Sequence, residues 1–481
     1  MTFSRELFNE NVKTTLFVAV SLLLAQAGLQ AQTSNTNALL NRFLREQSAA
    51  FEPWDLGGQF RVRLEHKENF ATPGRGTVDF QDRGGNADNT YFLFRGKFHA
   101  GYKMDWLTIY GEARDSRTAS DERKPHPETD PLDLHQGYLL LGNAKEFPLT
   151  LKVGRQELSY GDERLIGAFD WNNIGRGFDA AKLRYDNSDF WIDGFVSRVV
   201  LTDPDEFNEA NDYDFLSGIY ASSRTIVPKN EVQTYFLVRN VSPDSPTAIG
   251  AGLPAFMTGA SARDIYTLGL RVKSLPGEFG SWDYDAELAG QLGNFKSGTG
   301  QRLDHEAFAA HVAGGYTWTN AFGKPRAGLE YNYASGDGDS TDGKHGTFDN
   351  LLPTNHKFYG HMDFFSWQNI HNVRVTGSLR PLKGLTLTVD YHASWLANTS
   401  DSFYQASGAS RSTGGYGINA NAGSYVGSEV DLIANYNLCK AATLQGGYGH
   451  FFVGDYVKNS LSPTSGATDA DWVYLQMTLS F

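Results

Sequence analysis

The chain ends, over residues 470–481, with the sequence ADWVYLQMTLSF. Every second side chain near this end is apolar, namely Val473, Leu475, Met477, Leu479 and Phe481. The residues between them form a mixed set, Trp472, Tyr474, Gln476, Thr478 and Ser480. Because successive side chains of a β-strand point to opposite faces, this stretch predicts a strand with one apolar face and one mixed face.

The same alternation recurs upstream. In residues 385–394 the odd positions are apolar or aromatic and the even positions are polar. In residues 91–102 aromatic side chains alternate with Arg95, Lys97 and His99. A period of two over about ten residues is typical of a transmembrane β-barrel strand, with one face to lipid and one to water. A soluble β-sandwich would bury the apolar set instead, and residues 91–102 alone do not separate these two architectures.

Over the whole chain the pattern predicts about 18 strands. They fall at 57–66, 91–102, 106–115, 134–141, 149–157, 178–186, 189–199, 213–222, 231–240, 264–273, 281–292, 305–318, 324–334, 369–380, 384–395, 424–438, 441–453 and 470–481. The segment 213–222 has the faintest pattern, but it keeps short and long connections in alternation. We therefore predict an all-β fold, a transmembrane antiparallel up-and-down β-barrel with long extracellular loops and short periplasmic turns.

The two ends of the chain agree with export to the outer membrane. Arg5 and Lys13 precede an apolar stretch and then small residues, which predicts a signal peptide over residues 1–31. Residues 32–56 form a polar periplasmic segment or linker, and residues 57–481 form the barrel. The terminal strand, with its final Phe481, resembles the signal that the barrel-assembly machinery reads. We expect that machinery and outer-membrane lipid as partners, whereas the residues identify no periplasmic partner.

Composition excludes two classes of protein. Past the N-terminus no apolar run reaches the roughly 20 residues of a membrane-spanning helix, so a helical membrane protein is excluded. The formal net charge of −13 argues against a nucleic-acid partner, which would require an excess of Lys and Arg. The single cysteine, Cys439, cannot form an intramolecular disulfide.

Alternation also predicts which charged side chains face the lumen. The inward basic residues are Arg61, Arg63, Arg95, Lys97, Arg114, Lys152, Lys182 and Arg184. The inward acidic residues are Glu65, Glu112, Asp193, Asp283, Asp285, Glu287, Glu330, Asp390, Glu429 and Asp431, weighted toward the C-terminal half. Arg and Lys rings favour anions in pores, so a basic wall indicates anion selectivity. Alternatively, these charges only hydrate the lumen and pair across strands.

The densest charge lies in residues 154–173, GRQELSYGDERLIGAFDWNN, and continues to Asp179. It includes Arg155, Glu157, Asp162, Glu163, Arg164, Asp170 and Arg176. Such charge is costly to bury unless it is paired, so we expect the segment to fold inward as a hydrogen-bonded plug or constriction. A solvated external loop is the alternative.

At this segment the chain resembles the alginate export family, most clearly over residues 149–185. The resemblance implies an 18-stranded outer-membrane barrel with an electropositive constriction that conducts a polyuronate. The matching positions are Arg61, Arg95, Arg155 and Arg176, with the acids Glu157, Asp162 and Asp170 nearby. The function it implies is passage of an anionic polysaccharide, such as an alginate-like polyuronate, or its fragments. A porin selective for small acids or sugars is the alternative.

The sequence gives less support to an enzyme activity and to a calcium-binding site. An outer-membrane enzyme would need a nucleophile beside a histidine, and His361, His371 and His392 have Ser and Asp neighbours without a catalytic motif. We therefore predict no catalytic residues and no cofactor. The loop Asp337–Asp342 has oxygen ligands at alternate positions that suit calcium, but it lacks the terminal Glu of an EF-hand.

Overall fold

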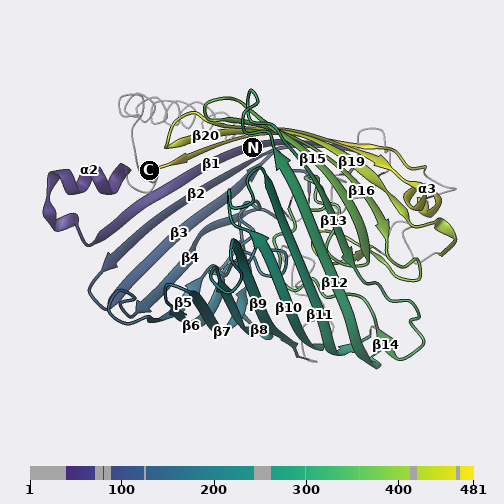
Figure 1. Ribbon diagram of the computed structural model, residues 1–481, viewed down its shortest axis with the longest axis horizontal. Helices are drawn as coiled ribbons and strands as arrows, with labels where there is room; N and C mark the ends of the chain where they lie inside the picture. The colour runs from purple at the N-terminus through teal and green to yellow at the C-terminus, as the bar shows by residue number, and fades with distance from the viewer. Residues whose placement is uncertain are drawn as a thin grey trace, which may run out of the picture.

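The computed structural model describes residues 39–70, 80, 88–123, 126–242, 262–297, 300–356, 358–411, 420–461 and 466–481. In this part of the chain, eighteen long antiparallel strands close into one barrel (Figure 1). The ring closes where β1 (Trp54–Glu68) pairs with β21 (Ala470–Ser480), with Arg61 opposite Thr478. The predicted fold is confirmed, and the faint segment 213–222 lies in β8.

The other wall strands follow in chain order, each antiparallel to its predecessor. They are β2 (Asn89–Lys103), β3 (Leu107–Ala119), β4 (Asp130–Leu141), β5 (Leu149–Gln156), β6 (Phe178–Asp186), β7 (Phe190–Val200), β8 (Ala210–Ser223), β9 (Asn230–Val241), β10 (Arg263–Ser274), β11 (Trp282–Lys296), β12 (Arg302–Thr317), β13 (Arg326–Ala334), β15 (Ile370–Leu382), β16 (Leu385–Leu396), β19 (Tyr425–Asn437) and β20 (Ala442–Val453). Minor elements in the loops are β14 (Lys344–His345), β17 (Phe403–Tyr404), β18 (Ser410–Arg411), η3 (Ala420–Ala422) and α3 (Asp455–Leu461).

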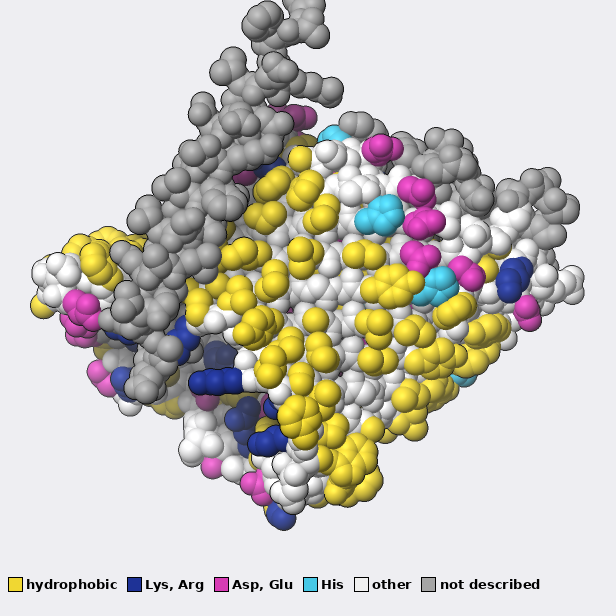
Figure 2. All heavy atoms as spheres, turned by 90° about the horizontal axis from the view of Figure 1, so that it is seen from above, with side chains coloured by type: hydrophobic (Ala, Val, Ile, Leu, Met, Phe, Trp, Pro, Cys, Tyr) yellow, Lys and Arg dark blue, Asp and Glu magenta, His cyan; other side chains and the backbone are white. Residues whose placement is uncertain are grey.

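The outward face of the wall is apolar. Leu268 is 65% exposed, Val196 61% and Leu475 53%. Exposing such large apolar side chains to water is energetically unfavourable. Figure 2 shows hydrophobic side chains spread over one broad face of the molecule, with charged side chains gathered toward its edges. No helix in the described ranges is long and apolar enough to cross a membrane. Because the exposed outward side chains are apolar, the strands present this face to lipid, as the strands of a membrane barrel do.

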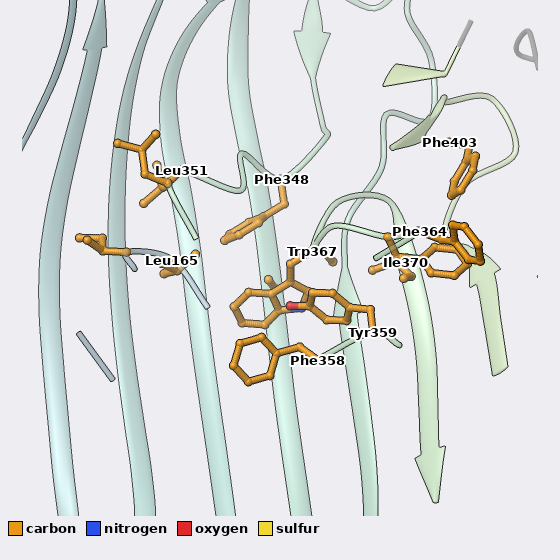
Figure 3. Close-up of a cluster of buried hydrophobic side chains, with 14 of the residues drawn as sticks. Leu165, Phe348, Leu351, Phe358, Tyr359, Phe364, Trp367, Ile370 and Phe403 are labelled. Atoms are coloured by element: carbon orange, nitrogen blue, oxygen red, sulfur yellow. The ribbon is translucent and has the colours of Figure 1, made fainter. Parts of the chain in front are cut away.

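The inward face is polar, and two long connections fold onto it. We call residues 157–177, between β5 and β6, inner loop A, and residues 335–369, between β13 and β15, inner loop B. They meet through backbone pairing of Ile166 with Leu352. Figure 3 shows the buried apolar side chains that gather around this meeting on the inner side of the wall, Leu165, Phe348, Leu351, Phe358, Tyr359 and Trp367 among them. This cluster belongs to a hydrophobic core inside the barrel that also includes inward side chains of the wall, such as Tyr220 and Trp472.

The N-terminal part of the described chain lies outside the ring. Helix α2 (Leu39–Gln47) and the short helix η2 (Ala49–Phe51) precede β1 (Figure 1). The Asn41 side chain donates to Asp55 and accepts from the Leu56 amide, which fixes α2 to the start of the barrel. The expected signal peptide, residues 1–31, lies outside the described residues and stays a prediction.

Candidate functional site

Four arginines of the N-terminal wall hold inner loop A by its backbone. Arg61 donates to the carbonyl oxygens of Asp170 (2.7 Å) and Asn172 (2.9 Å). Arg95 also donates to the Asp170 carbonyl (2.9 Å). Arg63 reaches the Trp171 carbonyl (2.9 Å), and Arg114 that of Ile174 (2.7 Å). A loop inside a barrel has no ladder partner for its carbonyls, so these guanidinium groups replace water as donors.

Two carboxylates of loop A complete the contact with this wall. Asp170 lies 3.0 Å from Arg95 and 3.2 Å from Lys97. Burial would raise the pKa of Asp170, but the charges of Arg95 and Lys97 lower it. Burial likewise would raise the pKa of Glu157, but the hydrogen bond from His135 and the Lys97 charge lower it to about 2. Both carboxylates are therefore ionised anchors at neutral pH.

Arg164 and Asp162 attach loop A to the opposite wall. Arg164 donates to Glu330 (2.8 Å) and Asn332 (3.1 Å), both on β13. Asp162 accepts from Arg164 (2.9 Å) and lies 3.5 Å from Arg271 on β10. Loop A therefore crosses the lumen from β1–β3 to β10 and β13.

Arg176 joins the two inner loops. Its guanidinium is buried and donates to the carbonyl oxygens of Gly167 (2.9 Å), Leu352 (2.6 Å) and Pro353 (2.9 Å). Burial lowers the pKa of Arg176 to about 9, which still leaves it charged at neutral pH. Arg176 is therefore internal to the loop assembly and does not face a passing solute.

Loop B is attached to the wall at β19 and at β9–β10, in each case through carboxylates. Glu429 on β19 accepts from the Met362 amide (2.9 Å), and Asp431 accepts from the His361 amide (3.4 Å). Asp349 of loop B pairs with Arg239 (3.1 Å) and Arg263 (2.6 Å) on β9 and β10. Together the two loops contact strands all around the ring, so they narrow the lumen.

An aromatic contact lies at the junction of the loops. The Trp171 ring stacks on His356 with centroids 3.8 Å apart and planes 3° apart. The Arg63 guanidinium lies 3.9 Å from the centroid of the Trp171 ring. Trp171 keeps part of its surface exposed, and the Asp170 side chain beside it is 61% exposed. These two residues therefore present an aromatic and an acidic surface to the lumen.

Lys152, Lys182 and Arg184 face the lumen nearer the short turns. Lys152 lies opposite Lys182 in the ladder between β5 and β6, and Arg184 is the next inward residue on β6. Asp193 is shared by Lys182 (3.5 Å) and Arg184 (3.4 Å), and Asp186 lies 3.2 Å from Arg184. The Arg184 side chain is 32% exposed and that of Lys182 is 19% exposed. These cations are more accessible than Arg61 and Arg95, which lie beneath loop A.

The expected lumen position of Arg155 is wrong. Arg155 lies on the face of β5 that carries Val153, which is 42% exposed to the lipid side. It forms a hydrogen-bonded pair with Asp179 on β6 (2.8 Å), which also points outward. Strand alternation, which turns Lys152 inward, turns Arg155 outward.

Inner loop B was not foreseen as part of the site. The signal was present in residues 356–367, HKFYGHMDFFSW, which are too aromatic for a solvated loop. In the Asp337–Asp342 loop, Asp337, Asp339 and Asp342 each accept a hydrogen bond from the backbone amide two residues further along the chain. Calcium binding there stays a prediction.

Of the three histidines considered for catalysis, His361 lies beside an expected acidic neighbour, Asp390, and the other two contact different groups. His361 lies 3.4 Å from Asp390, His371 contacts the Tyr331 hydroxyl (2.7 Å), and His392 contacts Asn372 (3.4 Å). Within the described residues, none of the three hydrogen-bonds to a serine or cysteine.

Solved structures with the same fold include several proteins of Pseudomonas aeruginosa, one of which, OpdK, is described as an outer membrane protein. OccK3 (OpdO) has 12% identity and a TM-score of 0.54, covering 89% of this chain and 96% of its own. OccD3 (OpdP) has 12% identity and a TM-score of 0.53, covering 89% and 91%. OpdK, solved with vanillate, has 13% identity and a TM-score of 0.52, covering 89% and 98%. At these identities the likeness shows the fold alone.

No curated protein matches the sequence. The family model described as alginate export matches residues 52–470, which is most of the barrel and agrees with the resemblance seen over residues 149–185. With its closed barrel, polar lumen and apolar outer wall, the chain belongs to the alginate export family and forms an outer-membrane channel.

Proposed function

We propose that this channel passes an anionic polysaccharide, such as a polyuronate, or its fragments. The observation that carries the proposal is the group of accessible lumen cations on β5 and β6, Lys152, Lys182 and Arg184. These three cations have two carboxylates, Asp193 and Asp186, within ion-pair distance. The local surplus of positive charge attracts anions in a narrow lumen.

Trp171 supports a carbohydrate as the solute. Its partly exposed ring lies at the junction of the inner loops, where a sugar ring could stack on it. In this proposal the basic residues Arg61, Arg63 and Arg95 act indirectly, because they position loop A and lie beneath it.

Planar-bilayer recording tests the proposal with the variants Lys152→Gln and Lys182→Gln. We expect anion selectivity to fall and block by oligouronates to weaken roughly fivefold per cation, as about 1 kcal/mol for a partly exposed ion pair implies. Arg155→Gln is the matched control, because Arg155 faces outward and should leave both properties unchanged. Equal permeation of polyuronates and neutral glycans would exclude the proposal.

A porin for small acids is the second candidate, and the narrowing of the lumen by the two packed inner loops favours it. Loops A and B join through Arg176 and through the pairing of Ile166 with Leu352, so a polymer would need them to separate. Block that strengthens with oligouronate length supports the polymer, whereas transport limited to monomers and dimers supports the porin.

A further inference from the structure

The outer wall of the barrel carries a groove on strands β4–β8, at the ends that lead into the long loops. Its volume is about 800 Å³. Leu134, Val153, Val196 and Phe215 line it with outward apolar side chains, and Phe207 of the β7–β8 connection also lines it. Phe207 is 72% exposed and Val196 is 61% exposed, so this apolar lining faces the lipid rather than the lumen.

Three charged residues lie in a row across the groove. Asp179 on β6 is opposite Arg155 on β5 and opposite Arg198 on β7. Asp179 accepts two hydrogen bonds from Arg155, at 2.8 Å and 3.3 Å. The row therefore has two cations and one anion, and the anion is engaged by Arg155.

The Arg198 guanidinium has no hydrogen bond or ion pair with any described residue. By strand alternation it shares the outward face of β7 with Val196. An unpaired charge beside the hydrocarbon of the bilayer is energetically costly. An anionic group of a membrane lipid is therefore the partner that Arg198 would pair with.

A second outward arginine at the same end of the barrel has a different environment. Arg117 on β3 pairs with Asp115 through two hydrogen bonds, at 2.7 Å and 2.9 Å. Arg117 does not line the groove. Of these two outward arginines, Arg198 is the one that combines an unpaired guanidinium with an apolar groove.

We propose that this groove binds a phosphate-bearing lipid of the outer leaflet. The long-loop ends of the strands lie at the outer surface, where lipid headgroups are located. The acyl chain would lie against Val153, Val196 and Phe215, and the lipid phosphate would accept from Arg198. The apolar lining favours a lipid over free phosphate, and the site is independent of what passes through the lumen.

Native mass spectrometry of the full barrel in non-ionic detergent, titrated with bis-phosphorylated lipid A, tests the proposal. We expect saturable binding that weakens roughly tenfold in Arg198→Gln, as loss of one charge-assisted hydrogen bond implies. The control Arg117→Gln should bind as the wild type does, because its guanidinium is already paired. Heat-modifiable migration on gels verifies that each variant is folded.

Three outcomes would overturn the proposal. Dephosphorylated lipid A could bind equally well, which would show acyl adsorption without a phosphate site. Arg117→Gln could lose as much affinity as Arg198→Gln, which would show a general charge effect. Millimolar inorganic phosphate could displace the lipid fully, which would show a free-phosphate site. A second variant, Phe207→Ser, should also weaken binding while leaving Arg198 in place, since Phe207 supplies apolar surface to the groove.

Discussion

Inner loops A and B each rest on one wall of the barrel whose side chains are of opposite type, guanidinium donors for loop A and carboxyl acceptors for loop B. The basic wall of β1–β3 donates to loop A carbonyl oxygens through Arg61, Arg63 and Arg95. The acidic wall of β19 accepts from loop B amides through Glu429 and Asp431. Each wall thus supplies the hydrogen-bonding partner that its loop lacks, because irregular backbone in a lumen must be satisfied by the wall or by water.

This difference shows that charge on a lumen wall does not by itself indicate solute selectivity. Arg61 is 4% exposed and Arg95 2%, so both are used to fix a loop. The cations left for a solute are those beyond the loops, such as Lys182 and Arg184. Anchor and selectivity residues share a charge but differ in exposure.

The largest expected effect comes from removing the basic anchors. In the double variant Arg61→Gln/Arg95→Gln, loop A loses its donors to the Asp170 and Asn172 carbonyls and its ion pair at Asp170. A hydrogen bond from a charged donor contributes about 1.5–3 kcal/mol, and loop A loses three of them at these carbonyls, so loop A should detach and single-channel conductance should rise. Conductance unchanged from the wild type would contradict the anchoring role of the basic wall.

The acidic wall can be tested through Gly360 of loop B. Its φ is +120°, and an added Cβ would lie 2.5 Å from the Glu429 carboxylate. Gly360→Ala should destabilise docking of loop B by about 1–3 kcal/mol, measured as faster hydrogen exchange over residues 358–369. Gly343→Ala is the control, because Gly343 also has a positive φ (+82°) but an added Cβ meets nothing within 4 Å. Equal effects of the two changes would mean that backbone strain alone is responsible.

The junction between the loops should respond more weakly. Trp171→Ala removes the stack on His356 and the contact with the Arg63 guanidinium. We expect a loss of about 1–2 kcal/mol in loop docking and more frequent current fluctuations in bilayers. Trp171→Phe should retain most of the stacking, so fluctuations as frequent as in Trp171→Ala would argue against a stacking role.

The smallest expected effect is a pH dependence at the same junction. Burial lowers the pKa of His356 below its ordinary 6.5 and outweighs the carboxylate of Asp363 at 3.0 Å. Docked loops therefore bind fewer protons than undocked ones, so docking is strongest above pH 6.5 and weakens as pH falls through the lowered pKa. Current fluctuations should increase in acid, and His356→Gln should remove this part of the increase.

Strand patterns predicted the wall well and the site only in part. Period-two alternation located the strands, including 213–222 within β8, because it is a local property of each segment. The same alternation places Arg155 outward, whereas the family resemblance and the dense charge of the following segment had suggested the lumen for it. Loop B was missed because its partners, such as Glu429, lie far away in the sequence.

The sequence by itself determined a lipid-facing barrel with a charged lumen, since side-chain alternation and a strand's length need no distant partner to be read. Tertiary structure alone decided which of those charges are covered. Arg61 and Lys182 have the same inward orientation, yet the first lies beneath loop A and the second stays more accessible. The path of a loop across a lumen depends on contacts between distant segments, and no local pattern encodes them.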